Sequence, residues 1–303
     1  MKLIRTIDCF SEKIQCVVTI GNFDGVHLGH QQLLHCLKQR SEALQLPSCL
    51  ITFDPQPNEF FAKDQAPARL TKFREKIQLL KSFKLDYLVC LKFNEHLSKL
   101  TAEEFINKIL VKKLGVKELI IGDDFRFGYK RQGDVELLRK FNFVTEVVPA
   151  YHLDNMRVSS SRIRTALAMG DLSLVQKLLG RSYCLTGHVA HGDKLGRKLG
   201  FPTANIHLNR KVVPVNGIFA VKIHNLTAAP LYGVANIGNR PAVGGGRTLL
   251  EVYIFDFDQS IYGRALEIEL VKKLRDEQYY ATLPQLQQQI ALDAKMAKDF
   301  FKI

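Results

Sequence analysis

The chain has 303 residues, 46% of them hydrophobic and 24% charged, which gives it the length for two folded domains and excludes a disordered protein. No apolar run is long enough to span a membrane, and charges interrupt the N-terminal residues, so we expect a cytoplasmic protein with neither a membrane anchor nor a secretory signal. The net charge of +13 suits nucleotide phosphates as well as nucleic acid.

Six cysteines are scattered along the chain, and no two of them stand at the spacing of a metal site. They are Cys9, Cys16, Cys36, Cys49, Cys90 and Cys184. This pattern predicts thiols in a reducing compartment, without a disulfide framework or a zinc site.

The first 150 residues alternate short β-rich apolar runs with helical stretches. The runs lie at 16–21, 49–54, 86–91 and 117–121, and the helical stretches include 30–44 and 101–115. This alternation predicts an α/β domain with a parallel sheet and helices on both faces. Ligands of such sheets bind at the carboxyl ends of the strands, where three of these runs continue into polar turns.

The pattern changes near residue 180, after a predicted helix at 171–180. Strand-like runs follow at 183–189, 217–224, 231–238, 248–255 and 265–271, several of them separated by turns with glycine or proline. This spacing predicts an antiparallel β-barrel. A C-terminal helix over 283–301 is expected to close it, with an apolar face made of Leu283, Leu286, Ile290, Ala294 and Ala297.

The sequence GNFDGVHLGH, residues 21–30, joins the first predicted strand to a helix. A helix N-terminus above the carboxyl end of a strand binds anions, and Gly25 and Gly29 leave room for a phosphate near the backbone. His27 and His30 are three residues apart, share a helix face and can both donate to one polyphosphate. The alternative is a loop with two solvated histidines, but the surrounding strand, helix and glycines favour the phosphate site.

A second candidate for anion binding is VSSSRIR, residues 158–164, which predicts a serine-rich helix start followed by Arg162 and Arg164. Two arginines beside such a helix start can clamp a phosphate. Serines also cap helices without any ligand, and capping alone would account for Ser159 or Ser160.

Further along, GRKLGFPTANI at 196–206 places Thr203 and Asn205 on either side of Ala204. In an extended segment this alternation sends both side chains to one face. A hydroxyl and an amide oxygen suit a hydrated Mg²⁺ bound to ATP. The dipeptides Pro-Thr and Ala-Asn in this segment are also common in turns, so the pattern alone is weak evidence for a metal site.

Glu251 lies in the predicted strand LLEVYIF, on the face opposite to Val252 and Ile254. The strand pattern alone favours a solvated glutamate at this position.

Five motifs, in order, resemble those of the bifunctional prokaryotic FAD synthetases, in which an FMN adenylyltransferase of the nucleotidyltransferase superfamily is joined to a riboflavin kinase. They are GNFDGVHLGH, TFDPQPNEFF, GDDFRFG, SSSRIR and GRKLGFPTANI, and the match runs from about residue 15 to the C-terminus. The resemblance implies a Rossmann-like adenylyltransferase domain over residues 1–180 and a riboflavin kinase domain over 181–303. It implies ATP, riboflavin and FMN as substrates and Mg²⁺ as cofactor.

By this resemblance, His27 and His30 bind the ATP phosphates while the FMN phosphate attacks the α-phosphorus and pyrophosphate leaves. Further ATP-binding positions would be Gly21, Asn22, Asp24, Asp124, Ser160 and Arg164, and the flavin would be bordered by Phe53, Pro55 and Pro57. Turn chemistry is the alternative for Asp124 and its neighbour Asp123, because aspartate favours turns.

In the kinase half, the resemblance makes Glu251 the general base for the ribityl 5′-hydroxyl and assigns Thr203 and Asn205 to the metal and the nucleotide. ATP would also contact Gly187, His188, Gly192 and Gly200, under a basic turn at 194–198, and Arg275 would help to enclose the flavin. The sequence departs from the family at Ala242, where threonine is usual, and at Tyr279 and Tyr280, where a basic residue and phenylalanine are usual.

Two other functions fit parts of the sequence. An RNA-binding barrel would concentrate positive charge and present aromatic side chains for stacking. The excess of basic residues is instead similar in the two halves, with 27 basic against 20 acidic residues before residue 181 and 16 against 10 from there on. A monofunctional adenylyltransferase with a regulatory barrel is disfavoured by the intact Thr203, Asn205 and Glu251. We therefore expect small-molecule partners and no nucleic acid, while the oligomeric state stays open.

Overall fold

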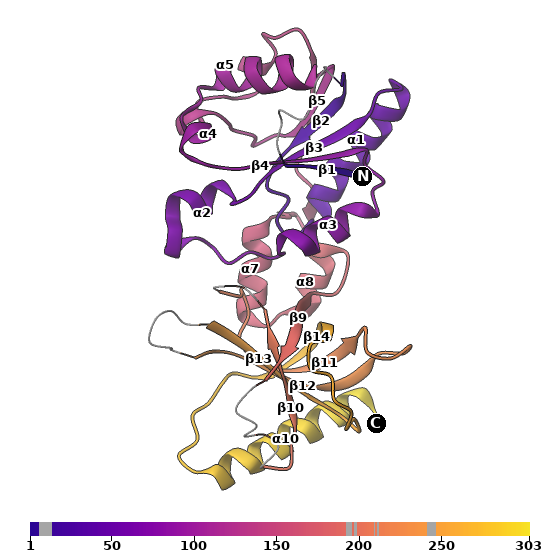
Figure 1. Cartoon of the computed structure of the whole chain (residues 1–303), viewed down its shortest axis with the longest axis vertical. Helices are drawn as coiled ribbons and strands as arrows, with labels where there is room; N and C mark the ends of the chain where they lie inside the picture. The colour runs from indigo at the N-terminus through magenta and orange to yellow at the C-terminus, as the bar shows by residue number, and fades with distance from the viewer. Residues whose placement is uncertain (6–13, 192–195, 197–198, 209, 211, 241–246) are drawn as a thin grey trace. The chain divides into compact units, whose positions relative to one another are not determined.

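The computed structural model describes residues 1–5, 14–191, 196, 199–208, 210, 212–240 and 247–303. The chain divides into two compact units (Figure 1). The first consists of Met1–Pro67 and Thr71–Ser160, and the second of Ala68–Leu70 and Ser161–Ile303. Within the described ranges, no helix combines the length and the apolar character needed to cross a membrane.

The first unit is built on a six-stranded parallel sheet with the strand order β1-β4-β3-β2-β5-β6. The strands are β1 (Lys2–Ile4), β2 (Val17–Ile20), β3 (Ser48–Phe53), β4 (Tyr87–Leu91), β5 (Glu118–Gly122) and β6 (Val144–Val148). The predicted parallel α/β fold is therefore confirmed. The two edge strands, β1 and β6, are additional to the strands predicted from the sequence.

Helices cover both faces of this sheet. Leu34 and Leu37 of α1 (Leu28–Ala43) and Leu80 of α3 (Phe73–Lys81) pack on one face. The other face is covered by α5 (Ala102–Phe105), the π-helix that continues it (Ile106–Leu114) and α6 (Val135–Leu138). The single α-helix predicted over 101–115 is thus a short α-helix followed by a π-helix.

Smaller elements complete the first unit. They are α2 (Pro57–Ala62), α4 (Glu95–Lys99), the 3₁₀ helices Lys63–Gln65 and Tyr129–Arg131, and the short antiparallel pair β7 (His152–Leu153) and β8 (Met156–Arg157).

The chain then enters α7 (Ser160–Met169) and α8 (Leu172–Leu179). Asp171 caps the start of α8, and Gly180 ends it in a left-handed conformation (φ 69°), as the sequence pattern predicted.

The second unit contains a closed antiparallel barrel with the strand order β10-β13-β12-β11-β14-β9, which confirms the predicted barrel. The strands are β9 (Cys184–Ala190), β10 (Thr203–His207), β11 (Gly217–His224), β12 (Leu231–Arg240), β13 (Arg247–Ile254) and β14 (Ala265–Arg275). Its interior is filled by apolar residues such as Phe219, Leu250 and Val252, which are fully buried.

Helix α10 (Leu283–Phe301) crosses the outside of the barrel (Figure 1). Ala294 and Ala297 pack against Ile218, Ala220 and Val234, so the second half of the predicted apolar face is buried as expected. Leu283 at the start of the helix is exposed, because the contact with the barrel is made by the later turns.

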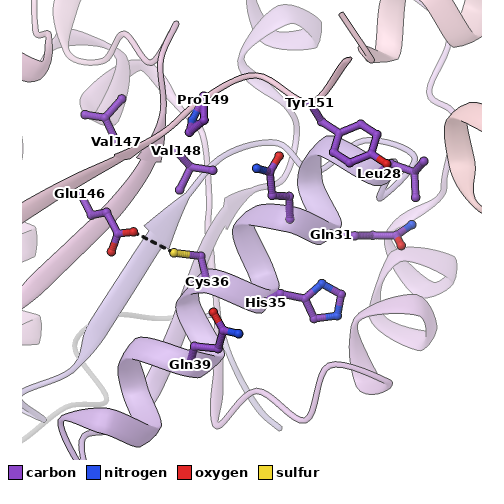
Figure 2. Close-up of a pocket in the computed structure, with 11 residues that line it drawn as sticks. Leu28, Gln31, His35, Cys36, Gln39, Glu146, Val147, Val148, Pro149 and Tyr151 are labelled. Atoms are coloured by element: carbon purple, nitrogen blue, oxygen red, sulfur yellow. Dashed lines mark hydrogen bonds between the residues drawn. The ribbon is translucent and has the colours of Figure 1, made fainter. Parts of the chain in front are cut away.

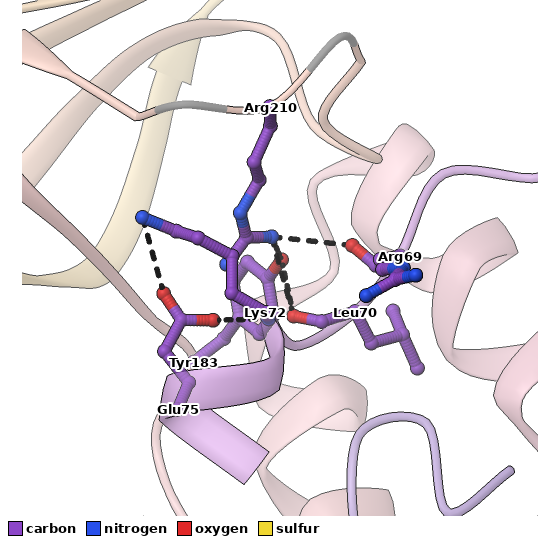
Figure 3. A network of polar contacts seen from close by, with 6 residues as sticks. All are labelled: Arg69, Leu70, Lys72, Glu75, Tyr183 and Arg210. Carbon is purple, nitrogen blue, oxygen red and sulfur yellow. Dashed lines mark hydrogen bonds and ion pairs between the residues drawn. The ribbon is translucent and has the colours of Figure 1, made fainter. Parts of the chain in front are cut away.

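The three residues Ala68–Leu70 belong to the second unit because side chains of that unit hold their carbonyl groups (Figure 3). Arg210 Nη1 donates to the carbonyl oxygens of Arg69 (3.2 Å) and Leu70 (3.4 Å), and the Tyr183 hydroxyl donates to Leu70 (3.1 Å). This short segment is therefore fixed by its contacts rather than by regular secondary structure.

Candidate active sites

Three polar turns meet at one edge of the first unit's sheet. The strands β3, β2 and β5 are adjacent and parallel, so the motifs that follow them, FDPQP, GNFDG and GDDFRFG, leave from the same edge. This is the edge at which parallel sheets bind ligands. The structure thus brings together motifs that are up to about 100 residues apart in the sequence.

His27 and His30 lie side by side at the start of α1. Their rings are stacked, with centroids 3.6 Å apart, and the His30 backbone N–H donates to His27 Nδ1 (3.3 Å). His27 therefore caps the helix through its Nδ1 atom. The Nδ1 atom of His30 is buried and has no hydrogen-bond partner in the described part of the chain. The two histidines share a face, as the sequence predicted.

Electrostatics keep the His30 ring neutral. Burial lowers the pKa of His30 well below its ordinary value of 6.5, and the charges of His27 and Lys76 lower it further. A neutral imidazole donates one hydrogen bond, which it can give to an anionic phosphate oxygen.

The turn at residues 21–27 is held by side chains from several elements. The buried Asp24 carboxylate accepts from the Thr71 backbone N–H (3.2 Å), and the Ser160 hydroxyl donates to the Asp24 carbonyl (2.9 Å). Ser160 thus lies at this turn. Arg164 lies in the second unit, where its Nε donates to the Ala68 carbonyl (2.6 Å). The ATP-binding roles of Asp24, Ser160 and Arg164 stay predictions.

Asp124 is exposed just after β5. Arg157 Nη2 lies 2.9 Å from a carboxylate oxygen of Asp124 and 2.9 Å from one of Asp123. This shared ion pair was not foreseen, since Arg157 comes from the separate strand β8. It gives both aspartates a structural partner, and the nucleotide-binding role of Asp124 stays a prediction.

An aromatic cluster borders the turn after β3. Phe53 contacts Phe93 edge-on with ring centroids 5.8 Å apart, and Phe60 and Phe61 of α2 both contact Phe93, at 5.4 and 5.7 Å. Of the other two residues predicted to border the flavin, Pro55 lies in the turn that leads into α2 and Pro57 is the first residue of that helix.

Gln56 stands between these two prolines and is only 5% exposed. Its Nε2 atom has no hydrogen-bond partner among the residues that the structure describes. An unpaired buried amide is costly, so such a group calls for a ligand or an ordered water.

The barrel places Glu251 between two asparagines. In the strand register Glu251 of β13 lies opposite Asn205 of β10 on one side and opposite Asn236 of β12 on the other. Residues directly opposite each other share a face, with Cβ atoms about 5 Å apart. Val252 and Ile254 point into the barrel and are buried, so Glu251 faces outward, as the alternation predicted.

Thr203 lies two residues before Asn205 on the same strand face. The resulting set of oxygen donors, a hydroxyl, two amides and a carboxylate, fits the preference of Mg²⁺ for oxygen ligands with several retained waters. A cluster of three or more His, Cys, Asp or Glu residues that could hold a metal by itself is not found within the described ranges.

The glycines and the histidine predicted to contact the kinase ATP have different surroundings. A Cβ on Gly187 would lie 2.5 Å from Ile206 Cγ2 and 2.6 Å from the His207 carbonyl oxygen, so close strand packing accounts for this glycine. His188 is exposed on β9, and Gly200 is exposed in a left-handed conformation (φ 84°). Gly192, most of the basic turn at 194–198 and Ala242 lie outside the described residues.

Arg275 binds a carboxylate of its own unit. Its Nε and Nη2 atoms pair with both oxygens of Asp293 on α10 (2.8 and 2.7 Å), and its Nη1 donates to the Asp276 carbonyl (2.9 Å). These contacts attach β14 to α10. The guanidinium also lies over the Tyr280 ring, 5.8 Å from its centroid. The predicted contact of Arg275 with the flavin stays a prediction.

Two family models match the chain, FAD synthetase over residues 9–162 and riboflavin kinase over residues 179–301. The bifunctional riboflavin kinase/FMN adenylyltransferase of Escherichia coli (strain K12) is 47% identical, over 99% of this chain and 98% of its own. The chain belongs to this family. The corresponding protein of Haemophilus influenzae (strain ATCC 51907 / DSM 11121 / KW20 / Rd) is 45% identical over 99% of both chains.

The fold is also similar to a solved structure. A crystal structure described as a macrolide-efflux protein from Streptococcus pneumoniae matches with a TM-score of 0.84 and 28% identity, over 98% of each chain.

Two residues near the candidate sites were not predicted from the sequence and are identified only in the structure. Asn236 stands beside Glu251, and its Oδ1 atom is buried without a hydrogen-bond partner in the described part of the chain. Lys76 of α3 is buried and donates to the Asn22 carbonyl. The alternation of β12 could have placed Asn236 on the outer face, but its pairing with Glu251 depends on the register of two distant strands.

The pocket in Figure 2, of about 510 Å³, lies along α1 rather than at the histidine pair. It runs from Leu28 past His35 to Gln39 and is closed on the other side by Glu146 and Tyr151. Only its upper end approaches the motif, since a Cβ on Gly29 would lie 3.7 Å from Tyr151 Cβ. No residue predicted to bind ATP or flavin lines it.

Proposed function

We propose that the two activities of this chain, riboflavin kinase and FMN adenylyltransferase, use separate sites, one in each unit. Adenylyl transfer is assigned to His27 and His30, and phosphorylation of riboflavin to Thr203, Asn205 and Glu251. The observation that carries the second assignment is the register that sets Glu251 between Asn205 and Asn236. The domain boundaries that we propose, residues 1–180 and 181–303, place one site in each domain.

At the first site the two stacked imidazoles bind the ATP phosphates. An FMN phosphate oxygen attacks the α-phosphorus, the bond between the α- and β-phosphates breaks, and pyrophosphate leaves. Charge that develops on the phosphate oxygens is stabilised by hydrogen bonds from His27 and His30. The aromatic cluster of Phe53, Phe60, Phe61 and Phe93 offers apolar faces for the flavin ring, and the unpaired amide of Gln56 offers it a donor.

At the second site Glu251 accepts the proton of the riboflavin 5′-hydroxyl while that oxygen attacks the γ-phosphorus and ADP leaves. Thr203 and Asn205 would hold Mg²⁺ with ATP, and the ion would neutralise charge on the phosphates. Asn236 offers a further amide beside Glu251. A cytoplasmic location and small-molecule partners without nucleic acid remain part of this proposal.

A pair of assays on one preparation tests the adenylyltransferase assignment. Purified His27→Ala protein is given riboflavin, Mg²⁺ and ATP, and separately FMN, Mg²⁺ and ATP, and the flavins are separated by chromatography. We expect riboflavin to be converted to FMN as in the wild type, while FAD formation falls by about two to three powers of ten, as for one lost oxyanion donor. Normal FAD formation from FMN would refute the assignment.

A further inference from the structure

Lys76 is a lysine in the interior of the first unit. Its side chain belongs to α3 and is 1% exposed. Lysine is almost never fully buried unless its charge is compensated, so a specific role for this ammonium group is expected. The group lies 2.6 Å from the carbonyl oxygen of Asn22, in the turn that leads to His27 and His30.

The backbone of this turn is strained. Phe23 has a φ of 48° and Val26 a φ of 42°, in the left-handed region that L-residues rarely adopt and β-branched residues least of all. Strain of this kind persists only where the surrounding structure fixes the backbone. The turn between β2 and α1 therefore needs contacts that hold it in place.

Side chains from several elements supply those contacts. Thr52 Oγ1 donates to the Asn22 carbonyl (3.3 Å), and Gln31 Nε2 donates to the Val26 carbonyl (2.9 Å). The Gly25 N–H donates to Thr71 Oγ1 (3.1 Å). Compared with these, the contact from Lys76 is shorter and carries a full charge, which makes a hydrogen bond roughly twice as strong.

Lys76 also acts on His30 through its charge. After burial and the neighbouring His27, Lys76 is the third cause that holds the pKa of His30 low. The lysine thus fixes the backbone before the two histidines and supports the neutral form of the second.

We propose that Lys76 is a positioning residue for adenylyl transfer: through the Asn22 carbonyl it holds the strained turn so that His27 and His30 face the ATP phosphates. The inference rests on the assignment of adenylyl transfer to those histidines. Lys76 is not assigned a contact with substrate.

The test compares Lys76→Met with Lys81→Met, since Lys81 is an exposed lysine of the same helix. At saturating FMN and ATP we expect kcat for FAD formation to fall about 10- to 100-fold in the Lys76 variant, because small displacements of catalytic groups have effects of this size. The Lys81 variant should keep the wild-type kcat. Phosphorylation of riboflavin in the same preparations should be unchanged in both.

Lys76→Arg separates positioning from packing, because arginine keeps the charge and the donors. We expect the kcat of Lys76→Arg to lie between those of the wild type and Lys76→Met. In Lys76→Met, NMR should show the His30 imidazole titrating at a higher pH than in the wild type. If Lys76→Met does not fold, Lys76→Gln replaces it, with the same expected order of kcat.

The proposal is overturned if Lys76→Met or its Gln replacement keeps kcat within twofold of the wild type. Equal losses in the Arg and Met variants, with both melting early, would also overturn it in favour of a packing role. His30→Ala is measured alongside: if that variant makes FAD normally, the assignment of the histidines fails, independently of Lys76.

Discussion

At the scale of single residues, the position of Glu251 on its strand allows a clean test of the proposed general base. Its neighbours across the strands are two amides, Asn205 and Asn236. The side chain is half-buried on the outside of the barrel, while the packing of β13 depends on Val252 and Ile254. The carboxylate can therefore be changed with little effect on the core.

Glu251→Gln should fold like the wild type and lose one activity. The amide keeps the shape of the side chain but cannot accept the proton of the 5′-hydroxyl, which should lower riboflavin phosphorylation by roughly 10²–10⁴-fold. Supplied with FMN, the same protein should make FAD at the wild-type rate. Loss of both activities would indicate a structural role, and loss of neither would return Glu251 to a solvated strand residue.

His30 is expected to make the stability of the first unit depend on pH. Because burial and neighbouring charge hold its pKa well below 6.5, the folded protein does not bind the proton that the unfolded chain binds near pH 6.5. The unfolded state then carries more protons, and the free energy of unfolding falls as the pH drops through this range. We expect the urea midpoint to fall between pH 7.5 and 5.5, and to fall less in His30→Gln. Equal pH dependence in the two proteins would contradict this.

At the scale of elements, α10 is attached to the barrel by one buried ion pair besides its apolar contacts. The Asp293 side chain is 3% exposed and that of Arg275 18% exposed, and the two form a bidentate pair. Asp293 is on the face of the helix that also buries Ala294 and Ala297. The pair holds the position of α10 along β14.

Asp293→Ala should destabilise the barrel by about 1–3 kcal/mol, because it leaves the half-buried Arg275 guanidinium without its carboxylate partner. Asp299→Ala, at an exposed position of the same helix, should change stability by less than about 0.5 kcal/mol. Urea unfolding of the full chain measures both. Similar midpoints for the two variants would show that the apolar contacts alone hold the helix.

Periodicity predicted the elements that are long and strongly patterned. The strands β2 to β5, the capped helix α8 and most barrel strands follow directly from alternation and turn residues. Edge strand β1 has only three residues, and β6 mixes Thr145 and Glu146 with valines, so neither shows a clear pattern. The pairings Arg275–Asp293, Arg157–Asp124 and Asn236–Glu251 join elements whose proximity is set by the tertiary fold, which local patterns do not contain.

At the scale of the whole molecule, the chain carries two independent sets of chemical groups. His27 and His30 belong to the first unit, and Thr203, Asn205 and Glu251 to the second. The excess of basic residues is also divided, with 27 against 20 acidic residues before residue 181 and 16 against 10 after it. A positive field in both halves suits two reactions that each bind a nucleotide polyphosphate.

A mixture of two variants tests whether the sites act independently. Glu251→Gln chains should convert only FMN to FAD, and His27→Ala chains only riboflavin to FMN. Because each set of groups lies within one unit, we expect the mixture to make FAD from riboflavin through FMN released into solution, with a lag that shortens as protein concentration rises. The lag follows from the time that released FMN needs to accumulate before the second variant works at its full rate, and the wild type at equal concentration serves as the control. If each variant keeps its one activity but the mixture makes no FAD, the intermediate must pass between sites of the same chain.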